Sequence, residues 1–259
     1  MELNRRVLVC LHGFMGCGGD WQAFAGAMEG WEVLAPDLPW HGEEFDDGAE
    51  PEEFGEELVR WLRERGIERA VLAGYSMGGR IGIRVALQFP EVFPVFIGVS
   101  TTAGIEDQQA QRERLGADLE IVGRLRGISE EGEFRRFLEE WWGMEVFGGG
   151  SRDGLGEFLE SRLGHDPGRL ARCLETWGSG RLEPAWGGLG DYPGSALFVS
   201  GALDLKYTEI ARRMAAAVPR GDCAVVAAAG HRLPSECPRG LARVVSDWLA
   251  GGAGIAFPP

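Results

Sequence analysis

The chain has 259 residues and a formal net charge of −14, which argues against nucleic acids and anionic membrane surfaces as partners. Apolar residues make up 44% of the chain and charged residues 25%, the proportions of a soluble globular protein. No apolar run reaches the length of about 18 residues that a transmembrane helix needs. The first residues lack the features of a signal peptide, and the five cysteines lack CxxC spacing. We therefore expect a cytoplasmic protein with reduced cysteines and no membrane partner.

The first part of the chain alternates apolar runs with helical periodicity, as expected of parallel strands joined by helices. Asp20 stands where its side chain would cap the first helix. Cys10 and Cys223 lie in apolar runs and are interpreted as small core residues. Strands are expected at residues 6–11, 31–35, 69–75 and 95–100, and helices at 21–28, 51–65 and 79–89.

The pattern changes after residue 105. Residues 106–190 contain no strand-like run and have a charged, helical composition with interleaved aromatic residues. Alternation then resumes, with strands expected at 196–200 and 223–226 and helices at 209–218 and 238–249. The predicted fold class is α/β, a mostly parallel sheet flanked by helices. Its core would comprise residues 1–105 and 191–259, and residues 106–190 would form an inserted helical cap.

The most informative motif is Gly74-Tyr75-Ser76-Met77-Gly78, between an expected strand and an expected helix. A G-x-S-x-G sequence in this context is typical of a nucleophile elbow, a tight turn that exposes a serine hydroxyl at the end of a strand. The flanking glycines remove the Cβ atoms that would collide in such a turn. The motif alone occurs often by chance, so it needs support from other residues.

Two later residues give that support. Asp204 follows the expected strand at 196–200, and His231 follows the one at 223–226. The order Ser, Asp, His is the order of a triad in α/β-hydrolases. In such a triad the histidine takes the serine proton, and the carboxylate orients the imidazole and stabilises its charge. We therefore predict Ser76, Asp204 and His231 as catalytic, and interpret the other three histidines, His12, His41 and His165, as structural.

The loop after the first strand, His12-Gly13-Phe14-Met15-Gly16, is the other candidate element. An oxyanion hole in this fold takes one backbone N–H from that loop and one from the residue after the nucleophile. The predicted donors are therefore the amides of Phe14 and Met77. The alternative is an ordinary glycine-rich turn. No cluster of histidine or cysteine has metal-ligand spacing, and no phosphate-binding glycine loop appears, so neither a metal nor a cofactor is expected.

These residues resemble a branch of the α/β-hydrolases, the 2-succinyl-6-hydroxy-2,4-cyclohexadiene-1-carboxylate synthases of menaquinone biosynthesis. The shared segments run through most of the chain, and the most diagnostic is Ser76-Met77-Gly78-Gly79-Arg80. Trp40 departs from the family, which usually has glycine there. The segment after His231, residues 232–238, keeps the family's Glu-x-Pro but lacks the second histidine that relatives usually have before it. The other shared segments are 11–16, 20–21, 37–39, 41–42, 74–75, 201, 204, 206–207 and 230–231.

The resemblance implies a lyase that eliminates pyruvate from 2-succinyl-5-enolpyruvyl-6-hydroxy-3-cyclohexene-1-carboxylate. This small-molecule substrate carries three carboxylates, so its site needs fixed cations. By local matches to the family, the substrate-binding residues would be Arg80, Arg114, Arg162, Trp141 and Tyr75. For each arginine the alternative is a solvated helix residue paired with an acidic residue four positions away.

Two other functions remain open. A serine esterase or C–C-bond hydrolase would use the same triad without an arginine cluster, and would hydrolyse simple esters well. A binding protein that has lost catalysis could also have this fold, although an intact triad argues against it. The sequence does not fix the oligomeric state, for which we expect a monomer or a weak dimer.

Overall fold

The computed structural model describes residues 5–144 and 154–251. At the centre of this part lies a six-stranded sheet in the order β2-β1-β3-β4-β5-β6, with every neighbouring pair parallel. The fold class expected from the sequence is confirmed. The strands are β1 (Val7–Leu11), β2 (Glu32–Leu34), β3 (Val71–Tyr75), β4 (Val95–Val99), β5 (Ser195–Gly201) and β6 (Gly221–Val226).

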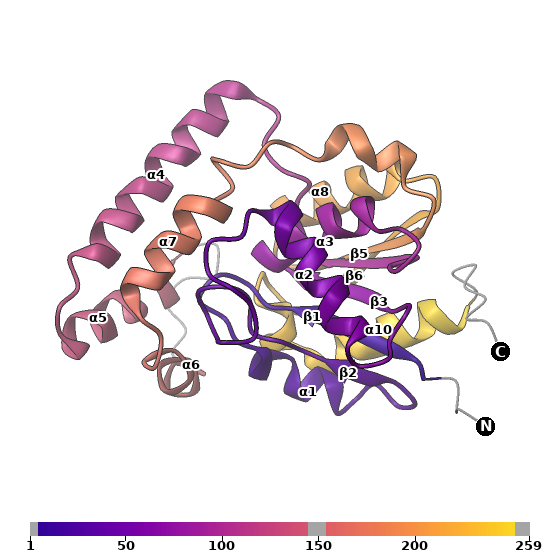
Figure 1. The fold of residues 1–259 in the computed structure, drawn as a ribbon, viewed down its shortest axis with the longest axis horizontal. Coiled ribbons are helices and arrows are strands. Elements are labelled where there is room, and N and C mark those ends of the chain that lie inside the picture. The colour runs from indigo at the N-terminus through magenta and orange to yellow at the C-terminus, as the bar shows by residue number, and fades with distance from the viewer. Residues whose placement is uncertain (1–4, 145–153, 252–259) are drawn as a thin grey trace.

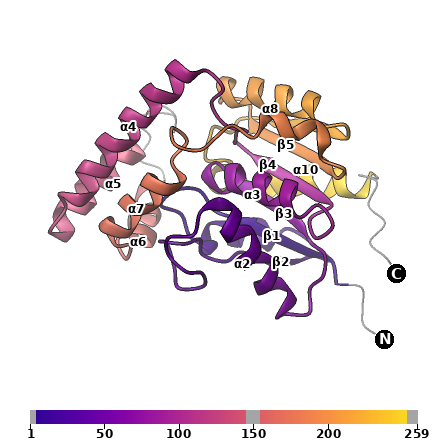
Figure 2. The same ribbon diagram turned by 45° about the horizontal axis from the view of Figure 1, so that its top comes forward.

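Helices cover both faces of the sheet and also form a separate group (Figures 1 and 2). α1 and α10 lie on one face, whereas α2, α3 and α8 lie on the other; α4 to α7 form the separate group, between β4 and β5 in the sequence. The α-helices are α1 (Gln22–Ala25), α2 (Pro51–Arg63), α3 (Met77–Gln88), α4 (Gln108–Arg126), α5 (Glu131–Trp142), α6 (Leu155–Arg162), α7 (Pro167–Trp177), α8 (Leu205–Ala217), α9 (Leu233–Glu236) and α10 (Pro238–Ala250), and the 3-10 helices are η1 (Gly18–Trp21) and η3 (Trp186–Asp191).

The alternation of side chains along the strands creates two apolar layers. In β1, Val7, Val9 and Leu11 pack in the layer that includes residues of α2, α3 and α8. Leu8 and Cys10 pack in the other layer, with residues of α1 and α10. Because all five residues are buried, β1 reads in the sequence as one continuous apolar run, as expected for a parallel strand covered on both faces.

The helices α4 to α7 bury an apolar cluster of their own. Its buried members include Leu125, Phe137 and Leu170, and among its buried members only Met15 comes from the sheet-forming part of the described chain. The division into a core of residues 1–105 and 191–259 and a cap of residues 106–190 stays a prediction, since Cys173 and Trp177 of α7 pack in the core layer beside the sheet. None of the helices in the described part of the chain combines the length and apolar composition needed to cross a bilayer.

Three local expectations are wrong. The helix expected at 21–28 is a 3-10 turn, η1, followed by the short α1. Asp20 lies inside η1 rather than before a helix, and its carboxylate accepts a hydrogen bond from the Cys17 amide at 3.2 Å. Cys223 is exposed rather than part of the core, because β6 is the last strand of the sheet and its solvent-facing side is not covered.

Candidate active site

Ser76 lies in the turn between β3 and α3, as a nucleophile elbow requires. Its backbone has φ 50° and ψ −110°, values that residues with a side chain rarely adopt. The flanking residues have no room for a side chain, because a Cβ at Gly74 would collide with the carbonyl group of Gly78, and one at Gly78 with the carbonyl oxygen of His12. The Thr101 hydroxyl donates to the Ser76 carbonyl at 2.7 Å. Tertiary contacts therefore hold the serine in its strained conformation.

The structure brings Asp204 and His231 to Ser76, although 155 residues separate the serine from the histidine. Nδ1 of His231 lies 2.7 Å from Oδ2 of Asp204, and Nε2 lies 3.4 Å from Oγ of Ser76. The other Asp204 oxygen accepts from the Tyr207 amide at 3.2 Å, because Asp204 caps the N-terminus of α8. The His231 side chain is 3% exposed. The imidazole thus lies between the serine hydroxyl and the carboxylate, in the order that proton transfer from the serine requires.

The amides of Phe14 and Met77 belong to the two segments that adjoin Ser76. Met77 is the first residue of α3, where a helix leaves N–H groups unpaired. Phe14 lies in the loop after β1, which packs against the elbow: a Cβ on Gly13 would collide with the ring of Tyr75. No acceptor for either amide is found among the described residues. Both amides therefore remain candidate donors to a ligand at the Ser76 hydroxyl.

Arg80 is a buried cation one turn after Ser76. Its side chain is 8% exposed, and its Nε has no acceptor among the described residues. Burial is the main reason that its pKa is lowered, and the nearby charge of Arg114 lowers it further. A buried guanidinium group with an unpaired donor is costly. Such a group is suited to an anionic ligand that supplies the missing acceptor.

The other two arginines already have carboxylate partners. Arg114 donates from Nε to Asp118 at 2.7 Å, four residues along α4, and its side chain is 42% exposed. This is the helix pairing considered as the alternative for each arginine. Arg162 donates through Nη2 to both oxygens of Asp20 at 2.6 Å, and its side chain is 11% exposed. Arg162, at the end of α6, therefore links this helix to η1.

Trp141 and Tyr75 contact residues of the predicted site. The Trp141 ring packs edge-on against the Phe14 ring, with centroids 5.6 Å apart. The Tyr75 ring lies 5.7 Å from the His231 ring, and burial raises the pKa of its phenol. The structure thus places the aromatic residue from α5 beside the loop that carries one candidate oxyanion donor.

Two contacts at the triad were not predicted. The Tyr207 ring packs on the His231 ring with centroids 4.5 Å apart. The sequence signals for this contact are its position three residues after Asp204 and its place in the shared segment 206–207. The Arg232 guanidinium group lies 3.4 Å from the centre of the Trp142 ring. Burial lowers its pKa, and Glu236, 3.5 Å from its Nε, raises it. Arg232 therefore joins the segment after the triad histidine to the end of α5.

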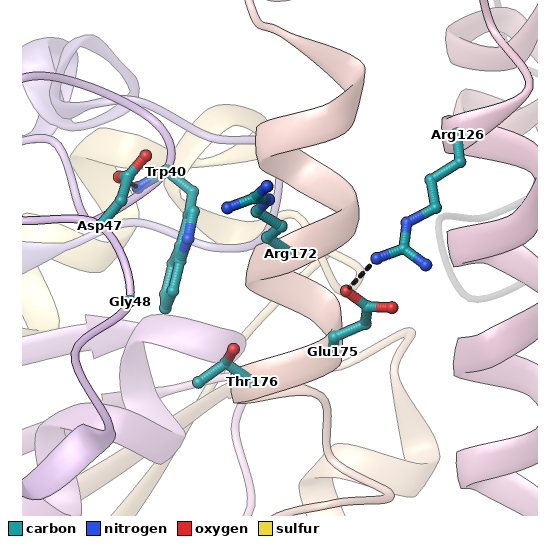
Figure 3. A pocket seen from close by; sticks show the side chains of 7 residues that line it. All are labelled: Trp40, Asp47, Gly48, Arg126, Arg172, Glu175 and Thr176. Atoms are coloured by element: carbon teal, nitrogen blue, oxygen red, sulfur yellow. Dashed lines mark hydrogen bonds and ion pairs between the residues drawn. The ribbon is translucent and has the colours of Figure 1, made fainter.

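A surface hollow of about 360 Å³ lies apart from these residues, between α7 and the loop after β2 (Figure 3). It includes the Arg126–Glu175 ion pair, with a distance of 2.7 Å. None of the predicted site residues lines it, so the chemistry described above belongs elsewhere. Its lining residues are Trp40, Asp47, Gly48, Arg126, Arg172, Glu175 and Thr176.

Comparisons with known proteins find relatives and solved structures that match most of the chain. A 2-succinyl-6-hydroxy-2,4-cyclohexadiene-1-carboxylate synthase of Pectobacterium atrosepticum is 27% identical over 247 residues, which cover 94% of this chain and 93% of that protein. The structure of MenH from S. aureus matches with a TM-score of 0.85 at 26% identity, covering 97% of this chain and 95% of the other. A thermophilic esterase from Thermogutta terrifontis, solved with malate bound, shares the fold at 22% identity and a TM-score of 0.79, covering 95% and 90% of the two chains.

The family model described as the alpha/beta hydrolase family matches residues 8–244. This range covers the six strands, apart from the first residue of β1, and the segments that carry Ser76, Asp204 and His231. The chain belongs to the alpha/beta hydrolase family.

Proposed function

We propose that this chain is a lyase of menaquinone biosynthesis that eliminates pyruvate from 2-succinyl-5-enolpyruvyl-6-hydroxy-3-cyclohexene-1-carboxylate to give 2-succinyl-6-hydroxy-2,4-cyclohexadiene-1-carboxylate. The observation that carries the proposal is the buried Arg80, which follows the elbow by one helical turn and whose Nε has no acceptor within residues 5–144 and 154–251. An enzyme that only cleaves neutral esters has no need of a desolvated cation there, whereas a tricarboxylate substrate would pair with it. The named relative from Pectobacterium atrosepticum supports the same activity.

In the proposed reaction Ser76 acts as a base rather than as a nucleophile. His231 takes the hydroxyl proton of Ser76, and Asp204 stabilises the imidazolium ion. The Ser76 oxygen then removes the proton next to the succinyl carbonyl, and the enolate charge is stabilised by the Phe14 and Met77 amides. The electron pair moves through the ring and breaks the C–O bond to the enolpyruvyl group, which leaves as pyruvate after taking a proton.

The arginines would bind the three carboxylates. Arg80 could donate its Nε–H, unpaired among the described residues, to one carboxylate. Arg114 and Arg162 would have to share their guanidinium groups or exchange Asp118 and Asp20 for substrate carboxylates. Trp141 and Tyr75 would line the site. Sharing is favoured over exchange for Arg114: its side chain is 42% exposed, but that of Asp118 is only 2% exposed, so a full exchange would leave a buried carboxylate without its cation.

The experiment that tests the proposal measures pyruvate release from the enolpyruvyl substrate with a coupled lactate dehydrogenase assay. Ser76→Ala should lower kcat by roughly 10³-fold or more. Arg80→Met should lower kcat/KM by about 30- to 900-fold, which corresponds to about 2–4 kcal/mol for a lost charge-assisted contact. Arg84→Met is the matched control, because Arg84 is on the same helix and pairs with Glu52 at 3.0 Å. Wild-type activity in Arg80→Met would contradict the proposed role.

A serine esterase or C–C-bond hydrolase is the alternative with the same triad. In that case Ser76 attacks the substrate, and an ester substrate leaves an acyl group on it. Mass spectrometry of quenched reactions distinguishes the two, because the lyase forms no covalent adduct. Rapid hydrolysis of p-nitrophenyl acetate with an acylated Ser76, and no pyruvate release, would favour the hydrolase.

The cellular setting is also a proposal. We propose that the chain works in the cytoplasm on this small molecule, as a monomer or weak dimer and without a metal or cofactor. The net charge of −14 supports a freely diffusing enzyme rather than one held on anionic membranes or nucleic acid. Cell fractionation and light scattering of the purified chain test these two points.

A further inference from the structure

Two buried histidines outside the triad connect the loops that follow β1 and β2. The Leu38 amide donates to Nε2 of His12 at 2.9 Å, and the Met15 amide donates to Nε2 of His41 at 3.0 Å. The two bonds are reciprocal, since each loop supplies one imidazole and one amide, and each bond joins residues 26 positions apart. The imidazole rings touch edge to face, with centroids 4.8 Å apart. We call this pair of bonds the histidine brace.

The hydrogen bonds determine the protonation of both rings. Each Nε2 accepts from a backbone N–H, so it carries a lone pair and no proton. The proton of the neutral ring is therefore on Nδ1. Consistent with this, Nδ1 of His12 lies 2.8 Å from the Gly13 carbonyl oxygen, and Nδ1 of His41 lies 2.9 Å from that of Pro39. Both rings are neutral Nδ1–H tautomers with both nitrogens occupied.

These bonds hold two successive peptide planes around Phe14. The Gly13 carbonyl and the Phe14 N–H belong to one planar trans peptide and point in opposite directions. By donating to the Gly13 carbonyl, His12 therefore directs the Phe14 N–H away from its own ring. The next plane contains the Met15 N–H, which His41 accepts. Met15 has φ 59°, a value unfavourable for a residue with a side chain, so this part of the loop needs such support.

We propose that His12 and His41 are positioning residues that orient the Phe14 amide as an oxyanion donor, a role that rests on the proposed function. Neither residue touches the reacting atoms; each acts through the backbone of the loop. The proposal explains why two histidines, 0% and 7% exposed, occupy loops beside the active site without belonging to the triad.

The surroundings keep the brace neutral. The charges of Arg162 and His165 act on both rings, and His12 also disfavours a proton on His41. The carboxylate of Asp47 interacts with His41, and those of Asp20 and Asp37 with His165. Burial is the main cause that lowers the pKa of both rings, that of His12 to about 3. The brace should therefore persist throughout the neutral and mildly acidic range.

The test compares His41→Gln with His41→Leu. The glutamine Oε1 can accept the Met15 N–H in place of Nε2, whereas leucine fills similar space without an acceptor. We expect His41→Leu to lower kcat by about 10- to 100-fold, less than the loss of an oxyanion donor, with KM changed less than threefold, and His41→Gln to recover most of kcat. Equal activity of the two variants, or a change confined to KM, would overturn the proposal.

A second measurement does not depend on turnover. In ¹⁵N-labelled protein, the His12 and His41 rings should remain Nδ1–H tautomers from pH 5 to 8, and the Phe14 amide resonance should shift in His41→Leu and return in His41→Gln. An Nε2–H tautomer, or an unshifted Phe14 amide in His41→Leu, would overturn the proposal. If the wild-type chain releases no pyruvate, the proposed function fails on its own. The brace is then judged by these resonances and, where ester cleavage occurs, by kcat for the ester.

Discussion

The backbone strain at Ser76 can be measured by comparing two substitutions at that position. The φ of 50° and ψ of −110° are available to glycine without penalty, whereas a residue with a Cβ pays about 1–3 kcal/mol. Ser76→Ala keeps the Cβ and the strain, and Ser76→Gly removes both. Glycine also increases the entropy of the unfolded chain, which costs about 0.4–1 kcal/mol relative to alanine. The balance predicts that Ser76→Gly is more stable than Ser76→Ala by about 1 kcal/mol.

Urea unfolding followed by circular dichroism gives the free energy of unfolding of both variants. The control is Ala216→Gly, at an exposed position in α8, where glycine should lower stability by about 1 kcal/mol. The sign of the alanine-to-glycine difference should therefore be opposite at the two positions. Both Ser76 variants lack the hydroxyl group and should be equally inactive in pyruvate release. If the alanine-to-glycine change lowered the free energy of unfolding as much at position 76 as at position 216, the backbone at Ser76 would not be strained.

Three further predictions concern stability. Gly78→Ala should lower the free energy of unfolding by about 2 kcal/mol or more, because the new Cβ meets the Leu11 and His12 carbonyl oxygens; a thermal melt equal to that of the wild type would contradict it. Trp177→Phe should cost about 1–3 kcal/mol in urea unfolding, since the Ala49 carbonyl loses the buried indole N–H that donates to it at 3.0 Å. Burial lowers the pKa of His12 from 6.5 to about 3, so below pH 6.5 the unfolded chain binds the extra proton and stability falls as pH falls. The free energy of unfolding of the wild type, relative to that of His12→Gln, should therefore fall by about 1.4 kcal/mol per pH unit between pH 6 and 4. A difference that does not change with pH in urea unfolding would mean that His12 is charged in the folded chain.

The elbow and the strands can be predicted from the sequence, because both depend on residues that are close together in the chain. Gly74 and Gly78 leave room for a turn that no larger residue fits, and this requirement is visible as G-x-S-x-G between an apolar run and a helix. The buried strand β1 appears as a continuous apolar run for the same local reason. Asp204 and His231 could be selected because parallel strands end at a common edge, so residues that follow different strands meet there.

The partners of individual side chains were decided by tertiary structure. The sequence places Asp20 before a helix, but its carboxylate binds Arg162, 142 residues away. Cys223 looks like a core residue because its neighbours are apolar, yet β6 is the edge of the sheet and leaves it exposed. The histidine brace was likewise hidden, since His12 and His41 appear only as two isolated histidines in loops.

There is a physical reason why the elbow and strands can be predicted from the sequence and the side-chain partners cannot. Steric limits on the backbone and the burial of alternate side chains act between residues close in sequence, and so they leave a periodic or spaced pattern that can be read. Hydrogen bonds such as that of Met15 to His41, and ion pairs such as that of Arg162 to Asp20, depend on atoms lying within about 3 Å after distant segments have packed. No spacing in the sequence encodes that distance, and only the folded chain determines it.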